Sequence, residues 1–230
     1  MDKFIQINNI SKIFNPNSDI EVIGLHNINL SFSQGEFVVL SGPSGSGKTT
    51  LLNLIGGLDD STKGEVIIDK ANISTMDENN LSDHRRDNIG FVFQAYNLVP
   101  VLTGRENIEY IMKLQGKSQI DCDKRVKYLS KKLDIESILN KLPSHMSGGQ
   151  QQRVAVARAV ATKPKLILAD EPTANLDSVS ATKLMSMMEK LNKEENITIL
   201  FSSHDPMVIA KAKRLIQLKD GVVVDDEITI

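Results

Sequence analysis

The chain has 230 residues, of which 40% are hydrophobic and 24% are charged, and its formal net charge is -2. This balance is typical of a globular protein, and the absence of a basic excess gives no electrostatic reason to expect nucleic-acid binding. The first residues do not have the pattern of a signal peptide, and no apolar run reaches the ~18–20 residues that cross a bilayer. We therefore expect any role at a membrane to depend on a partner.

Short apolar runs predict the strands and a helix of an α/β protein. "EFVVL" (residues 36–40) reads as a buried strand, and "TTLLNLIGG" (residues 49–57) reads as a helix that Gly56 and Gly57 end. Further strands are expected at residues 64–69, 89–94, 165–170 and 197–203, and a hairpin at 214–224. The runs at 165–170 and 197–203 are almost continuously apolar, which is typical of parallel strands buried on both faces.

The middle of the chain is predicted to be mainly helical. Helices are expected at residues 104–115 and 124–139, and a third is expected to begin near Gln150. We therefore expect one domain over residues 1–230. Its α/β core would comprise residues 1–94 and 162–230, and its helical lobe residues 95–161.

Cys122 is the only cysteine, which excludes an intrachain disulfide and indicates a reducing compartment. It stands between Asp121 and Asp123, whose charges disfavour a thiolate. We expect an unreactive cysteine on the surface.

A glycine-rich stretch between the first strand and the helix predicts a phosphate-binding loop. Gly42, Gly47, Lys48 and Thr49 fit the pattern G-x-x-x-x-G-K-S/T. Glycine lets the backbone wrap closely, so that successive N–H groups and the start of the helix face phosphate oxygens. Lys48 would contact the β- and γ-phosphates, and the Thr49 hydroxyl would bind Mg²⁺.

Two acidic residues follow the strand at 165–170. Asp170 ends this apolar run, where an acid could orient Mg²⁺ through water, and Glu171 could polarise an attacking water molecule. An Asp-Glu pair alone could be an ordinary transition from strand to loop. Together with the glycine-rich loop, the Asp-Glu pair predicts nucleotide hydrolysis.

Ser147, Gly148 and Gly149 precede a helix and predict a second anion-binding helix terminus. One chain rarely needs two sites for one γ-phosphate. Two chains facing each other head to tail would use both, so this stretch predicts a homodimer with each nucleotide between two chains.

These motifs resemble those of the nucleotide-binding subunits of ABC transporters, and the resemblance covers nearly the whole chain. It implies a P-loop NTPase core with a mainly parallel sheet, an antiparallel β subdomain and an inserted α-helical lobe. Phe14 falls where the family places an aromatic residue, more often tyrosine, that stacks on adenine. Gln94 matches the Q-loop glutamine, residues 174–177 the D-loop, and His204 the switch histidine.

The resemblance also implies the roles of individual residues. Glu171, His204 and Gln94 are expected to be catalytic, and Thr49, Gln94 and Asp170 are expected to hold Mg²⁺. ATP is expected to contact Phe14, Gly42, Pro43, Ser44, Gly45, Ser46, Gly47, Lys48, Thr49, Thr50, Gln94, Asp170 and, in the facing chain, Ser147, Gly148, Gly149 and Gln150.

Longer stretches such as "IGFVFQAYNLVPVLTGRENI" and "EPTANLD" most resemble the ATPases of the MacB, LolD and FtsE type. These imply a bacterial permease partner of the FtsX/MacB type and a place on the inner face of the cell membrane. Lipoprotein release, macrolide or peptide efflux and mechanotransmission all remain open. The alternatives are a regulatory ATPase that signals through a membrane partner, and a soluble ABC ATPase acting on DNA or ribosomes. A nucleotide kinase would not need Ser147–Gln150.

The connection between the strand expected at 89–94 and the helix expected at 104–115 should lie on the surface, yet it contains several apolar side chains. These are Tyr96, Leu98, Val99, Val101 and Leu102. As a group they predict a groove for a short helix of the permease. The alternative is that they cover the core of the lobe itself.

Overall fold

The computed structural model describes residues 3–228 and contains a large, mostly parallel sheet. Its strand order is β10-β9-β3-β8-β7-β6, and only β10 runs antiparallel to its neighbour. The strands are β3 (Phe37–Ser41), β6 (Ile89–Phe93), β7 (Leu166–Asp170), β8 (Thr198–Ser202), β9 (Arg214–Lys219) and β10 (Val222–Ile228). Every residue of β3 and β8 is buried, as their apolar sequences predict.

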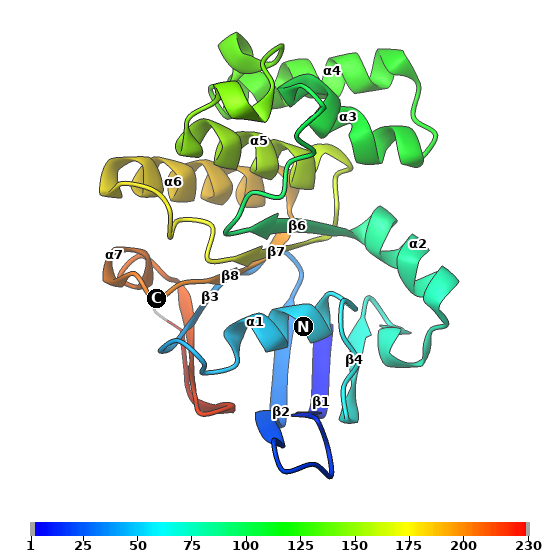
Figure 1. The fold of residues 1–230 in the computed structure, drawn as a ribbon, viewed down its shortest axis with the longest axis vertical. Helices are drawn as coiled ribbons and strands as arrows, with labels where there is room; N and C mark the ends of the chain where they lie inside the picture. The colour runs from blue at the N-terminus through cyan, green and yellow to red at the C-terminus, as the bar shows by residue number, and fades with distance from the viewer. Residues whose placement is uncertain (1–2, 229–230) are drawn as a thin grey trace.

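A smaller antiparallel sheet covers one end of the molecule, in the order β2-β1-β4-β5. Its strands are β1 (Lys3–Phe14), β2 (Val22–Ser33), β4 (Lys63–Ile68) and β5 (Ala71–Asn72). It shares one hydrophobic core with the helix α1 (Lys48–Ile55) and one face of the large sheet. The antiparallel subdomain implied by the family resemblance is therefore present (Figure 1).

Helices form a lobe on the other side of the large sheet, at the top of Figure 1. The lobe contains α3 (Gly104–Leu114), α4 (Gln119–Lys132) and α5 (Gly148–Ala161), with 3-10 turns at Glu136–Ile138 and Pro143–His145. The remaining helical elements are α2 (Glu78–Asn88), α6 (Ser178–Glu195), α7 (Pro206–Ile209) and a 3-10 turn at Ile73–Thr75. None of these helices, within residues 3–228, is long and apolar enough to span a membrane.

The lobe and the rest of the chain share a second hydrophobic core that includes α5, α6 and the adjacent face of the large sheet. Arg125 of α4 also ties the lobe to α6, because its guanidinium lies 2.6 Å from the Glu195 carboxylate. The same side chain donates to the carbonyls of Val160 and Ala161 at the end of α5. β6 ends at Phe93, one residue before the expected boundary at 94/95, and α5 ends at Ala161. The division of the chain into a core and a lobe at these positions stays a prediction.

The helix predicted at 104–115 is confirmed, but the one predicted at 124–139 is wrong at both ends. Ser118 caps α4, since its side chain accepts from the Asp121 N–H, so the helix starts earlier. It ends at Lys132, and Asp134 then adopts a left-handed backbone with φ 53°. A left-handed residue interrupts the i to i-4 hydrogen-bond ladder, and only a short turn follows.

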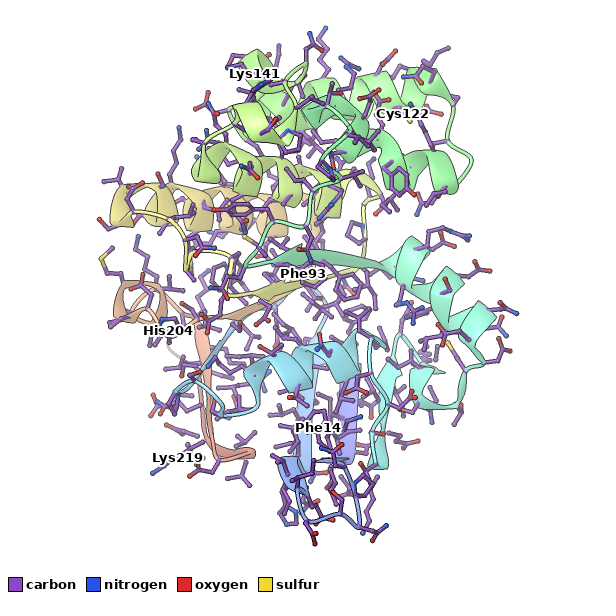
Figure 2. All side chains as sticks on the ribbon, viewed as in Figure 1. Phe14, Phe93, Cys122, Lys141, His204 and Lys219 are labelled. Atoms are coloured by element: carbon purple, nitrogen blue, oxygen red, sulfur yellow. The ribbon has the colours of Figure 1, made fainter. Side chains whose placement is uncertain are left out.

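The prediction that Cys122 lies on the surface is also wrong. Cys122 is fully buried on the inner face of α4, one and two turns before Val126 and Leu129 (Figure 2). Burial raises the pKa of the Cys122 thiol, and the nearby Glu109 carboxylate raises it further. The expected lack of reactivity therefore has burial as its main physical cause.

We predict that the Cys122 thiol reacts with a disulfide reagent such as DTNB only when the lobe opens. A raised pKa means less thiolate at neutral pH, and burial blocks access, so both effects slow the reaction. The native protein should react at least ~10-fold more slowly than the urea-unfolded chain, measured by absorbance. Equal rates in the two states would contradict the packing of α4.

Candidate functional site

The glycine-rich loop between β3 and α1 follows a path that depends on glycine. Gly42 has φ 146°, and a Cβ there would lie 2.1 Å from the Leu218 carbonyl oxygen. Gly47 has φ 103°, and a Cβ there would lie 2.9 Å from the Gly24 carbonyl oxygen. Other residues would clash with main chain at both ends of the loop, so sequence and packing together enforce a backbone cradle.

Lys48 places its ammonium group inside this loop. The side chain is only 5% exposed, and its Nζ donates to the carbonyls of Gly42 at 2.7 Å and Pro43 at 3.0 Å. The Glu171 carboxylate lies 3.8 Å from the same Nζ. The loop therefore combines N–H groups, a helix N-terminus and a fixed cation, which suits an anion with several charges.

A cavity of about 260 Å³ extends from the loop to an aromatic side chain. Residues 44–50 and Glu171 line one part of it, and Phe14, Val22, Ile23 and Gly24 line the other. Phe14, labelled in Figure 2, is 37% exposed at the end of β1. An apolar end and an anion-binding end within one cavity match the two parts of a nucleotide.

Asp170 lies between two hydroxyl groups that fix its carboxylate. Thr49 donates to Asp170 Oδ2 at 2.9 Å, and Ser202 donates to Asp170 Oδ1 at 2.7 Å. Ser202 also accepts from the Glu171 N–H at 2.8 Å. The parallel register of β7 and β8 produces this arrangement, because it pairs Asp170 with Ser202. Ser202 is not among the site residues expected from the sequence, although its place at the end of an apolar strand was a usable signal.

Glu171 and His204 face each other at the ends of neighbouring strands. His204 Nδ1 lies 2.9 Å from Glu171 Oε2, because β7 and β8 are neighbouring parallel strands. Glu171 has a left-handed backbone with φ 45°. Such a conformation in a residue with a long side chain costs ~1–3 kcal/mol and is common at functional sites. The imidazole is 64% exposed and the carboxylate only 19%, so the pair borders the loop from the solvent side.

Gln94 and Ser147–Gln150 lie apart from this cluster in a single chain. Gln94 is exposed, and among residues 3–228 its side chain makes no hydrogen bond, although its carbonyl accepts from Asn175. Ser147 caps α5 reciprocally with Gln150, so the helix begins at Gly148, close to the expected start. Neither segment lines the cavity at the loop. The roles expected for both stay predictions.

Thr49 and Asp170 offer the oxygen ligands that Mg²⁺ prefers. Thr49 Oγ1 and Asp170 Oδ2, from α1 and β7, lie 2.9 Å apart. The described residues contain no group of three or more His, Cys, Asp and Glu side chains that could hold a metal. The pair therefore fits a cation that takes its other ligands from phosphate and water.

Residues 25–174 match the family described as ABC transporter, so the chain belongs to that family. An ABC transporter ATP-binding protein of Methanocaldococcus jannaschii, MJ0796, is 44% identical over 97% of this chain and 96% of its own length. The macrolide export ATP-binding/permease protein MacB of Campylobacter jejuni is 42% identical over 88% of this chain, which corresponds to 31% of MacB.

Solved structures give the same result for the fold. A dimeric structure of the MJ0796 ATP-binding cassette, in a post-hydrolysis state with ADP and Pi, superposes with a TM-score of 0.91 at 42% identity. The match covers 98% of this chain and 99% of that one. The α/β fold with an inserted helical lobe is therefore that of an ABC ATPase cassette.

We predict that Ser202→Ala lowers the free energy of unfolding by ~1–3 kcal/mol, because it removes the partner of Asp170 Oδ1 and of the Glu171 N–H, and leaves Asp170 only its bond from Thr49. Urea unfolding measures this change. Ser130→Ala is the matched control: Ser130 is also buried, but its hydroxyl only donates to the Lys127 carbonyl of its own helix. A loss no larger in Ser202→Ala than in Ser130→Ala would contradict the assigned hydrogen bonds.

Proposed function

We propose that the protein is the ATP-binding and ATP-hydrolysing subunit of an ABC transporter complex. The observation that carries this proposal is the loop with Lys48 inside it, beside the fixed Asp170 and the strained Glu171. The MJ0796 cassette that binds ADP and Pi supports it, because it shares this fold at 42% identity.

The loop residues bind the phosphates and Phe14 stacks on the adenine. Gly42–Thr50 provide main-chain N–H groups, and Lys48 exchanges its carbonyl contacts for the β- and γ-phosphates. Thr49 and Asp170, with Gln94, would hold Mg²⁺, and the ion would neutralise charge on the phosphates. Ser202 keeps the Asp170 carboxylate aimed at Thr49.

Glu171 acts on the attacking water. Its carboxylate polarises the water as a general base, and its position is set by the left-handed turn and by Ser202. His204, at 2.9 Å from that carboxylate, orients it and reaches toward the γ-phosphate. Glu171 and His204 thus accept and hold the proton of the attacking water, and the rest of the site binds and orients the nucleotide.

A second copy of the chain completes the site. Ser147 and the N-terminus of α5 bind the γ-phosphate held by the facing chain, so the dimer is head to tail. The dimeric structures of the MJ0796 cassette support this assembly. It also explains why Ser147–Gln150 lie away from the cavity in a single chain.

The partner is an integral permease of the FtsX/MacB type, so the protein works in the cytoplasm on the inner face of the membrane. An open groove of about 340 Å³ supports this part of the proposal. Its apolar lining includes Leu58, Phe91, Phe93, Val99 and Tyr110. The groove suits one short helix. The relative MacB is described as an ATP-binding/permease protein, so its name includes both an ATP-binding part and a permease.

The segment after Gln94 lies partly at this groove and partly against the core of the lobe. Val99 lines the groove and Val101 is 77% exposed, whereas Leu98 packs against the core of the lobe. Arg158 of α5 lines the groove too and donates to the carbonyls of Tyr96 and Asn97. A helix seated there would therefore contact α5, the helix that Ser147 caps.

The proposed dimer predicts complementation between two inactive chains. Lys48→Ala alone and Ser147→Arg alone should each lose hydrolysis, because each lesion reaches both sites of its homodimer. In an equal mixture, a mixed dimer carries both lesions at one site and leaves the other intact. Hydrolysis should return to about a quarter of the wild-type rate, since half of the dimers are mixed and each keeps one site.

The control for this experiment is a mixture of two separately tagged Lys48→Ala preparations, which should stay inactive. Phosphate release and co-purification of the two tags measure turnover and mixing. A confirmed mixed dimer without hydrolysis would contradict the head-to-tail arrangement.

The proposed groove predicts where a permease can be crosslinked. In a Cys122→Ala background, cysteines at Tyr110 and Val101 should crosslink to the cognate permease in membranes, because both positions are exposed, Tyr110 lines the groove and Val101 lies two residues after Val99, which lines it too. A cysteine at Asp220, in the hairpin turn, is the matched control and should not crosslink. Crosslinks only from position 220 would place the permease elsewhere.

A further inference from the structure

We propose that Lys12 is a positioning residue that strengthens stacking of the nucleotide base on Phe14. This inference rests on the proposed function, and it names a residue outside the cavity as a determinant of base affinity. Its basis is the juxtaposition of a fixed cation, an aromatic ring and an apolar cavity wall.

The Lys12 ammonium is held against the Phe14 ring. Its Nζ lies 5.2 Å from the ring centroid, within the range of a cation–π interaction. The side chain is only 14% exposed, and Nζ pairs with Asp59 Oδ1 at 2.6 Å and the Asp60 carbonyl at 2.7 Å. A flexible lysine is thereby fixed in one position.

The ring borders the cavity, and the cation does not. Phe14 lines the cavity, whereas Lys12 and Asp59 are not among the described residues that do. Gly24 permits the ring position, because a Cβ at Gly24 would lie 2.5 Å from the ring carbon Cε2. A base in the cavity would contact the part of the ring that lines it, whereas Lys12 contacts the ring from outside the cavity.

A cation on one side of an aromatic ring draws π-electron density toward itself. The opposite side becomes less negative, which favours stacking with an electron-rich purine. The other residues at this end of the cavity are Val22, Ile23 and Gly24, which carry no polar side-chain atoms. Stacking on Phe14 is thus the main contact available to the base from this chain's side chains.

The anchoring of Lys12 also links the two ends of the nucleotide. Asp59 and Asp60 follow α1, the helix whose N-terminus forms the phosphate-binding loop. Lys12 therefore connects the ring under the base with the helix under the phosphates.

The test compares ATP with inorganic tripolyphosphate, which has the phosphates and no base. Lys12→Met keeps the length of the side chain and removes the charge, and it should raise the Kd for ATP about two- to five-fold. The Kd for tripolyphosphate should not change. Lys12→Arg, which keeps a cation, should restore ATP affinity, and kcat at saturating ATP should stay at the wild-type value.

Two controls make the result specific. Lys3→Met removes an exposed lysine from the same strand and should leave both Kd values unchanged. In a Phe14→Leu background, Lys12→Met should add nothing further, because the effect passes through the ring.

Three results would overturn the inference: equal weakening of ATP and tripolyphosphate, an unchanged Kd for ATP, or an undiminished effect in Phe14→Leu. In each of these the wild-type protein still binds ATP, so the proposed function stands. Wild-type protein that bound neither ligand would overturn the proposed function and this inference together.

Discussion

The close approach of the phosphate-binding loop to its neighbours is the constraint on which the rest of the site depends. The main chain at Gly42 runs against the Leu218 carbonyl, and Gly221 donates its N–H to the Ser46 carbonyl. The hairpin of β9 and β10 thus supports the loop from outside. Because the loop cannot relax outward, its N–H groups and the Lys48 ammonium are arranged before any ligand binds, which lowers the entropic cost of binding.

The parallel sheet brings the acidic groups to this loop. The ends of β3, β7 and β8 meet at one edge, so Thr49, Asp170 and Ser202 lie in hydrogen-bond contact although they are far apart in sequence. Ser202 also accepts from the Glu171 N–H, which holds the left-handed backbone of Glu171 beside Asp170. The lobe instead places Ser147 at a distance, which suits a site that only a second chain completes.

Features with a local physical cause could be predicted from the sequence. The buried strands of the large sheet follow from apolar runs, and the phosphate-binding loop follows from glycine spacing. The end of α4 at Lys132 could not be predicted, because it depends on the left-handed backbone of Asp134 in an otherwise helical pattern. The burial of Cys122 likewise depends on which face of α4 meets the lobe core, and neighbouring charges in sequence do not determine that. Contacts between distant segments, such as Ser202 with Asp170 and Lys12 with Asp59, required the fold.

The central claim is that ATP joins two chains through one chain's loop and the other's Ser147. Sedimentation velocity of Glu171→Gln, with and without ATP, tests it most directly. The amide keeps the shape of the carboxylate but loses the charge that polarises water, so the nucleotide should remain uncleaved between the chains. The account predicts a monomer without nucleotide, a dimer with ATP, and a monomer again when Ser147→Arg is added. A Glu171→Gln chain that binds ATP and stays monomeric would contradict it.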